Sequence, residues 1–140
     1  MLLNLALGIA IMVATVVVHT GAMMLIMQRM RRRDCGRPNT RWDEIGEVAG
    51  AVLVLFFATV IEVAIWAVTY LALQAMDTFE AALYFSMVTF TTLGYGDITL
   101  QEDWRLLSSI QAANGIIIFG WTTALVIAVV QRMYQRQNPR

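Results

Sequence analysis

The chain has 140 residues, of which 59% are hydrophobic and only 14% are charged, and its mean hydropathy is +0.63. Such a composition is typical of a membrane protein, and the length leaves room for one small domain. The basic residues are all arginine and most lie in 29–41 and 132–140, a distribution that favours membrane topology over nucleic-acid binding.

Three apolar stretches are long enough to cross the hydrocarbon core of a bilayer, about 30 Å, as helices. They run over roughly 2–27, 48–75 and 106–130. In the first stretch the arginines follow the apolar run, whereas a cleavable signal peptide carries its positive charges before it. We therefore expect an N-terminal transmembrane helix within 1–28 that stays attached to the chain.

The arginines that follow the first helix set the expected topology. They are Arg29, Arg31, Arg32 and Arg33. By the positive-inside rule, 29–47 is a basic cytoplasmic loop and 132–140 a basic cytoplasmic tail, so the N-terminus lies outside and the C-terminus inside. This arrangement fits an integral protein of the plasma or inner membrane. A second use of the same arginines is the binding of anionic membrane lipid.

The segment between the second and third helices has an unusual composition. Its apolar part, Phe79 to Phe90, is too short to span a bilayer and too apolar for a free loop. We predict a re-entrant helix over 79–91, between an outer helix (48–75) and an inner helix (106–131). The glycine-rich stretch that follows can lie at membrane depth only where protein or a water-filled pathway receives it. Because three helices of one chain cannot enclose such a stretch, we expect several subunits around a shared axis.

The glycine-rich stretch reads Thr92-Leu93-Gly94-Tyr95-Gly96-Asp97. A pore that strips water from a cation must supply replacement oxygens, and rings of backbone carbonyls can do so. Successive carbonyls point the same way only in an unusual backbone, and Gly94 and Gly96 tolerate the positive φ angles that this backbone requires. Leu93 and Tyr95 would then turn their side chains outward, and Thr92 would add a hydroxyl at the inner mouth.

A longer run resembles the pore helix and selectivity filter of the potassium channel family. It reads Ala82-Leu83-Tyr84-Phe85-Ser86-Met87-Val88-Thr89-Phe90-Thr91-Thr92-Leu93-Gly94-Tyr95-Gly96-Asp97. The resemblance implies that K⁺ binds along the filter, at Thr92, Leu93, Gly94, Tyr95 and Gly96. It also implies that neighbouring residues support the filter, namely Tyr84, Phe85, Val88, Thr91 and Asp97.

Four positions depart from the family pattern. Leu93 replaces the commoner valine, which changes the packing behind the carbonyls. Tyr84 and Phe85 stand where many members carry two tryptophans that bond the filter tyrosine, and phenylalanine has no donor. Val88 stands where some bacterial members carry a glutamate coupled to the filter aspartate. That proton-sensitive link is therefore absent.

The stretch 114–124 resembles the inner helix of bacterial members of the same family. The resemblance implies a hinge at Gly115, cavity-lining side chains at Ile116, Phe119 and Thr123, and a cytoplasmic constriction near Ala128. Gly115 and Gly120 have an alternative explanation, because small residues also let membrane helices pack closely.

Two ionisable side chains lie within the apolar stretches, His19 in the first and Glu62 in the second. Such a group is costly inside a membrane and is usually paired or functional. Counted at about 1.5 Å per residue from the charged helix ends, the depth of Glu62 matches Asn114 in the third helix better than His19. We expect a structural hydrogen bond for Glu62. The alternative is a gating or proton-sensing role for His19 or Glu62.

The sequence thus predicts an all-α membrane protein with three transmembrane helices per subunit and a pore helix and filter between the second and third. We expect a homotetramer that conducts K⁺ passively, with K⁺ as the permeant ion and no cofactor. A weakly selective cation channel and a non-conducting membrane accessory subunit remain alternatives. We expect no enzyme, because His19 and Cys35, each the single residue of its type, give no nucleophile with a nearby base.

Overall fold

The computed structural model describes residues 2–33 and 40–137, and every regular element within them is helical. In chain order these elements are α1 (Leu2–Arg33), α2 (Arg41–Ala72), α3 (Phe79–Phe90), the short 3₁₀ helix η1 (Glu102–Trp104) and α4 (Arg105–Gln137). The described residues contain no strand, in agreement with the predicted all-α class.

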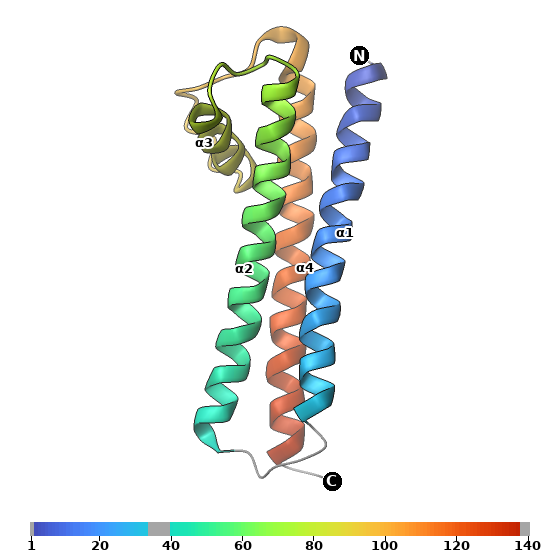
Figure 1. The fold of residues 1–140 in the computed structure, drawn as a ribbon, viewed down its shortest axis with the longest axis vertical. Coiled ribbons are helices and arrows are strands. Elements are labelled where there is room, and N and C mark those ends of the chain that lie inside the picture. Colours follow the sequence, from blue (N-terminus) through green and yellow to red (C-terminus); the bar gives the residue numbers. More distant parts are fainter. Residues whose placement is uncertain (1, 34–39, 138–140) are drawn as a thin grey trace.

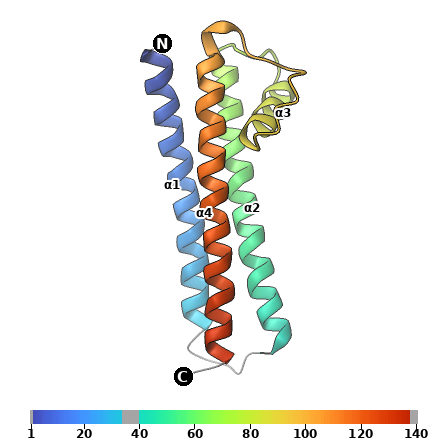
Figure 2. The same ribbon diagram turned by 180° about the vertical axis from the view of Figure 1, so that it is seen from behind.

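The three long helices lie side by side (Figure 1), and the view from behind shows the same order (Figure 2). α1 and α4 run in the same direction, α2 runs in the opposite direction, and α1 contacts both of them. α3 packs against α2 and α4 near the end of the bundle where α1 begins. We call this the α3 end. The opposite end, where α1 stops at Arg33, is the arginine end.

Each long helix forms all or most of a segment that is long and apolar enough to cross a membrane. These segments are Leu2–Arg32, Trp42–Ala72 and Glu102–Gln135. α3 is also apolar, but its 12 residues are too few to span a bilayer. The prediction of three spanning helices with a short apolar helix between the second and third is confirmed.

At the arginine end the helices are longer than predicted. Residues 29–33 continue α1, residues 41–47 form the first turns of α2, and residues 132–137 continue α4. The predicted loop 29–47 and tail 132–140 are therefore too wide. Arginine, glutamine, methionine and glutamate are good helix formers, so a cluster of charge does not by itself end a helix. The rest of both segments, 34–39 and 138–140, lies outside the described residues.

A capping box fixes the start of α2. The Asp43 amide donates to Thr40 Oγ1 at 3.4 Å, and the Thr40 amide donates to Asp43 Oδ2 at 3.1 Å. Two backbone donors that the helix itself cannot satisfy are thus paired. At the other end Gln74 has a φ of +54°, so α2 ends at Ala72, before the predicted residue 75.

Buried apolar side chains form two clusters along the bundle. The cluster at the α3 end includes Trp66, Tyr70, Phe85, Phe90, Leu107 and Ile118. The cluster at the arginine end includes Ile26, Met30, Ala51, Leu55, Leu125 and Val129. The first cluster holds α3 against α2 and α4, and the second holds α1 and α2 against α4.

Candidate functional site

Buried hydrogen bonds hold α3 between α2 and α4. The Ser86 hydroxyl donates to the Val63 carbonyl of α2 at 2.7 Å. The Gln111 amide of α4 donates to the Ser86 carbonyl at 3.1 Å and to Ser86 Oγ at 2.7 Å. The Tyr70 hydroxyl of α2 donates to Gln111 Oε1 at 2.7 Å. A buried polar network whose members find partners favours one arrangement of the helices, so these bonds set the position of α3.

Sequence reasoning missed this network. Tyr70, Ser86 and Gln111 are all 0% exposed. The available signal was their polarity, because a polar side chain inside an apolar stretch requires a partner. The sequence alone did not say which of them face one another.

A close backbone contact joins α4 to the C-terminal end of α3. A Cβ atom on Gly115 would lie 1.9 Å from the Phe90 carbonyl oxygen, so no larger residue fits without movement. At Gly120 a Cβ would meet nothing within 4 Å. Among the described residues of the chain, packing accounts for Gly115, whereas no contact requires a glycine at position 120.

After α3, the Thr91–Asp97 segment adopts an alternating backbone. Thr92, Gly94 and Gly96 have φ angles of +59°, +55° and +77°. Leu93 and Tyr95 between them are not in the positive-φ region. The two glycines adopt the positive φ that the sequence predicted. Thr92 was not predicted to do so, because a β-branched residue in this region is strained.

The segment is bonded to the last turn of α3. The Leu93 and Gly94 amides both donate to the Val88 carbonyl, at 3.0 and 3.3 Å, and the Thr92 amide donates to the Thr89 carbonyl at 3.0 Å. The Thr91 hydroxyl donates back to the Met87 carbonyl at 2.8 Å. Val88 thus supports the segment through its backbone oxygen.

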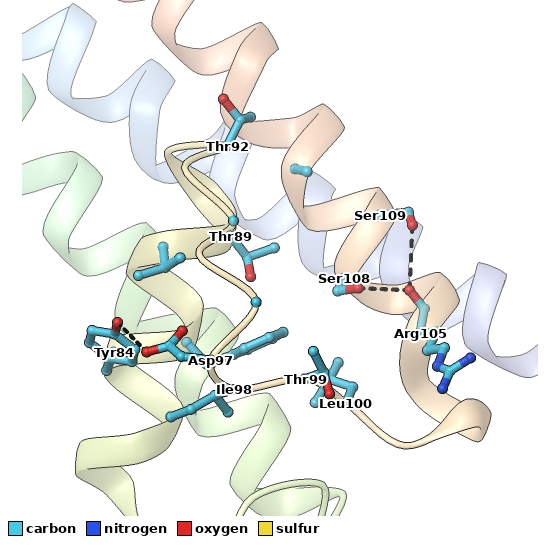
Figure 3. A pocket seen from close by; sticks show the side chains of 15 residues that line it. Tyr84, Thr89, Thr92, Asp97, Ile98, Thr99, Leu100, Arg105, Ser108 and Ser109 are labelled. Atoms are coloured by element: carbon cyan, nitrogen blue, oxygen red, sulfur yellow. Dashed lines mark hydrogen bonds between the residues drawn. The ribbon is translucent and has the colours of Figure 1, made fainter.

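A side-chain bond secures the far end of the segment. The Tyr84 hydroxyl donates to Asp97 Oδ2 at 2.6 Å (Figure 3). This bond lowers the pKa of Asp97 and raises the pKa of Tyr84. Within the chain, the partner of the Tyr84 hydroxyl is therefore Asp97. The resemblance suggested a different partner for this position, the filter tyrosine Tyr95. Phe85 is buried in the core, where its ring meets the edge of Tyr70 at a centroid distance of 5.3 Å.

A pocket of about 510 Å³ separates the segment from α4. Figure 3 shows Tyr84 and Asp97 on one side of the pocket and Ser108 and Ser109 of α4 on the other. Every residue from Thr91 to Asp97 is exposed in the single chain. The segment is thus held along its α3 edge and open elsewhere.

A family model described as Ion channel matches residues 50–132, which include most of α2, all of α3, the Thr91–Asp97 segment and most of α4. The chain belongs to this ion channel family. Ion conduction is the activity that the family supports, and together with the three apolar helices it makes the chain an integral membrane protein. No curated protein and no solved structure matches the chain.

Within the ion channel domain, residues 50–132, α4 presents one exposed face. Ile116, Phe119, Gly120 and Thr123 lie on this face by helical periodicity, and all are exposed. Ala128, further along α4, is exposed as well. The opposite side of α4 packs into the bundle through residues such as Ile118 and Leu125.

α1 lies outside the matched domain but is bonded to it by buried polar groups. His19 Nδ1 lies 3.1 Å from Glu62 Oε1 of α2, and His19 Nε2 lies 3.3 Å from Thr122 Oγ1 of α4. The His19 ring also packs on Trp121 at a centroid distance of 5.4 Å. His19 and Glu62 are both 0% exposed, and Glu62 Oε2 has no partner among the described residues.

The predicted depth match between Glu62 and Asn114 is wrong. Asn114 Nδ2 instead donates to Thr15 Oγ1 of α1 at 2.8 Å, and Glu62 pairs with His19. Counting residues from the helix ends ignores the direction in which each side chain leaves its helix. Thr15 and His19 are four residues apart, on one face of α1, and this face meets both partners.

Proposed function

We propose that the protein is a potassium-selective channel in which four copies of the chain surround one pore. The permeation path is lined by backbone carbonyls of Thr92, Leu93, Gly94, Tyr95 and Gly96. Conduction is passive, involves no covalent chemistry and uses no cofactor besides the permeant K⁺ ion.

The alternating backbone of Thr92, Gly94 and Gly96 is the observation that carries this proposal. A chain that alternates positive and negative φ turns successive peptide groups to the same side, so that their carbonyls form a column. Carbonyl oxygens of several such columns replace the hydration shell of a dehydrated K⁺ ion. The strained backbone at Thr92 also supports the proposal that this segment is the functional site, because strained backbone is concentrated at functional sites.

Exposure of the segment supports assembly around an axis. In the single chain Leu93 is 54% exposed and Tyr95 is 67% exposed. Backbone that is not in a helix can lie at membrane depth only where protein or a water-filled cavity surrounds it. Neighbouring copies supply that surrounding, and the resemblance to potassium channels gives their number as four.

The orientation of α3 favours a cation. α3 ends at Phe90, directly before the segment, so its C-terminal carbonyls lie at the base of the proposed path. The C-terminal end of a helix carries a partial negative charge, equivalent to about half an elementary charge. Four such ends around one axis would stabilise a cation and disfavour an anion.

The arginines define the proposed orientation in the membrane. Arg29, Arg31 and Arg32 lie at one end of the bundle, and Arg132 of α4 follows the apolar part of its helix toward the same end. By the positive-inside rule the arginine end faces the cytoplasm of a plasma or inner membrane, and the α3 end faces outward.

Purified protein in a planar bilayer under a K⁺/Na⁺ gradient tests the proposal. We expect a reversal potential near the K⁺ equilibrium potential and loss of conduction or selectivity in Gly94→Ala, whose φ of +55° strains any residue with a Cβ. Gly21→Ala is the matched control, because a Cβ there meets nothing within 4 Å. A reversal potential near zero would identify a weakly selective cation channel, and protein that stays monomeric without current would identify an accessory subunit.

A further inference from the structure

A second pocket, of about 400 Å³, lies between α1 and α2 at the arginine end. Its lining residues are Ile26, Arg29, Met30, Arg32, Gly46, Glu47, Gly50, Ala51 and Val54. We call it the arginine groove. Its α1 side, together with Gly46 and Glu47, lies outside the ion channel match, whereas Gly50, Ala51 and Val54 lie within it.

The groove is apolar on the side of the membrane core and basic at the helix ends. Ile26 and Val54 line it about one turn inside Arg29 and Gly50. Arg29 and Arg32 are three residues apart, so both side chains leave the same face of α1. Both are exposed, and neither has an ion-pair partner among the described residues.

We propose that the arginine groove binds one anionic phospholipid, with its phosphate between Arg29 and Arg32 and an acyl chain along Ile26 and Val54. The charges match this ligand. Arg29 and Arg32 are both positively charged, and their guanidinium groups attract a monoanionic phosphodiester. A phosphatidylcholine headgroup adds a cation beside the arginines and is disfavoured.

Two glycines leave room for the lipid on the α2 side. Gly46 and Gly50 are four residues apart on one helix face, and a Cβ atom on either would meet nothing within 4 Å. No packing requirement in the described chain accounts for them. A leucine at Gly50 would fill the groove without changing any charge.

A groove site differs from diffuse attraction of arginines to a charged membrane. Diffuse attraction counts every arginine near the surface alike, wherever its side chain points. Arg31 has the same charge and is exposed, but it lies about 200° around α1 from Arg29 and does not line the groove. Arg31 is therefore a matched control.

The test uses full-length protein in detergent, freed of lipid and titrated with phosphatidylglycerol, with bound lipid counted by native mass spectrometry. We expect one tight phosphatidylglycerol per chain and weaker binding of phosphatidylcholine. Arg29→Gln and Arg32→Gln should each raise the apparent Kd about fivefold, the effect of one interfacial arginine. Arg31→Gln should leave the Kd unchanged, and Gly50→Leu should weaken binding at least as much as Arg29→Gln.

Three results would overturn the proposal. Equal weakening by Arg31→Gln and Arg29→Gln would show diffuse attraction. Unchanged binding by both Gly50→Leu and Gly46→Leu would place the lipid elsewhere. Competition by inorganic phosphate alone, at the concentration of the lipid, would show that a free anion and not a lipid is the ligand. Circular dichroism of each variant confirms that its helices are intact.

Discussion

A double-mutant cycle on His19 and Glu62 measures how strongly α1 is tied to the ion channel domain. The variants are His19→Leu, Glu62→Leu and the combination of both. Each single change removes one member of a pair whose side chains are 0% exposed and whose nearest atoms, His19 Nδ1 and Glu62 Oε1, are 3.1 Å apart. The double variant places two apolar side chains together instead.

The expected magnitude follows from burial. His19→Leu leaves the buried Glu62 carboxyl without its partner, and such an unsatisfied group costs about 1–3 kcal/mol. Glu62→Leu likewise leaves the buried His19 Nδ1 atom without its hydrogen-bond partner. Hydrogen-bonded pairs in membrane proteins show coupling energies of about 0.6 kcal/mol on average and about 1.7 kcal/mol at most. Removing one partner of a buried ion pair costs more, about 3–5 kcal/mol.

Equilibrium unfolding in mixed micelles with rising SDS, followed by circular dichroism, gives the free energy of each variant. We expect the double variant to be less destabilised than the sum of the two single changes. Thr20→Val is the control, because the Thr20 hydroxyl donates to the Val16 carbonyl within α1 at 2.7 Å. Its effect should add to that of Glu62→Leu.

Strict additivity of His19→Leu and Glu62→Leu would refute the reasoning. It would mean that the two side chains do not stabilise each other and that α1 is held by apolar packing alone. Equal coupling of Thr20→Val with Glu62→Leu would point to a general loosening of α1 rather than to this hydrogen bond.

Three further predictions concern the ion channel domain and its contact with α1. Gly115→Ala should destabilise the protein by about 1–3 kcal/mol through overpacking against Phe90, while Gly120→Ala should be neutral, as measured by the same SDS titration; equal effects would contradict the contact. Tyr84→Phe should shorten channel open times near neutral pH. Because the pKa of Asp97 is lowered from 3.8 and that of Tyr84 is raised from 10.0, the stabilising contribution of their bond is present above pH 3.8 and below pH 10.0. It is lost as the pH falls through the lowered pKa of Asp97 or rises through the raised pKa of Tyr84, so the variant and the parent should converge in acid; a difference that persists there would exclude this bond as the cause. If His19 and Glu62 sense protons, His19→Ala or Glu62→Gln should shift the current–pH curve, and curves that overlay the parent for both variants would rule this out.

The sequence predicted those features that depend on one stretch of chain at a time. Helix length against bilayer thickness predicted the three spans and the short α3, and residue type predicted positive φ at Gly94 and Gly96. The start of α2 could also have been predicted more closely, because Thr40-x-x-Asp43 is a capping pattern.

Features that depend on contacts between two stretches of chain could not be predicted from the sequence. The pairing of Glu62 with His19 depends on how each helix is rotated about its own axis, and no residue count contains that angle. The positive φ of Thr92 opposes the preference of threonine, and it occurs where the Thr92, Leu93 and Gly94 amides all donate to carbonyls of the last turn of α3. The network of Tyr70, Ser86 and Gln111 likewise exists only where three helices meet.

The contact between Gly115 and the Phe90 carbonyl has a mechanical consequence. α4 cannot approach α3 more closely at this point, so the proposed hinge at Gly115 would turn about this contact. The part of α4 beyond this point, Ile116 to Gln137, is about 33 Å long. A tilt of this part by about 10° about Gly115 would displace its C-terminal end by about 6 Å, roughly the size of a side chain. In the proposed tetramer, a small rotation of the four α4 helices beside Phe90 would therefore cause a large change in the width of the pore at the arginine end.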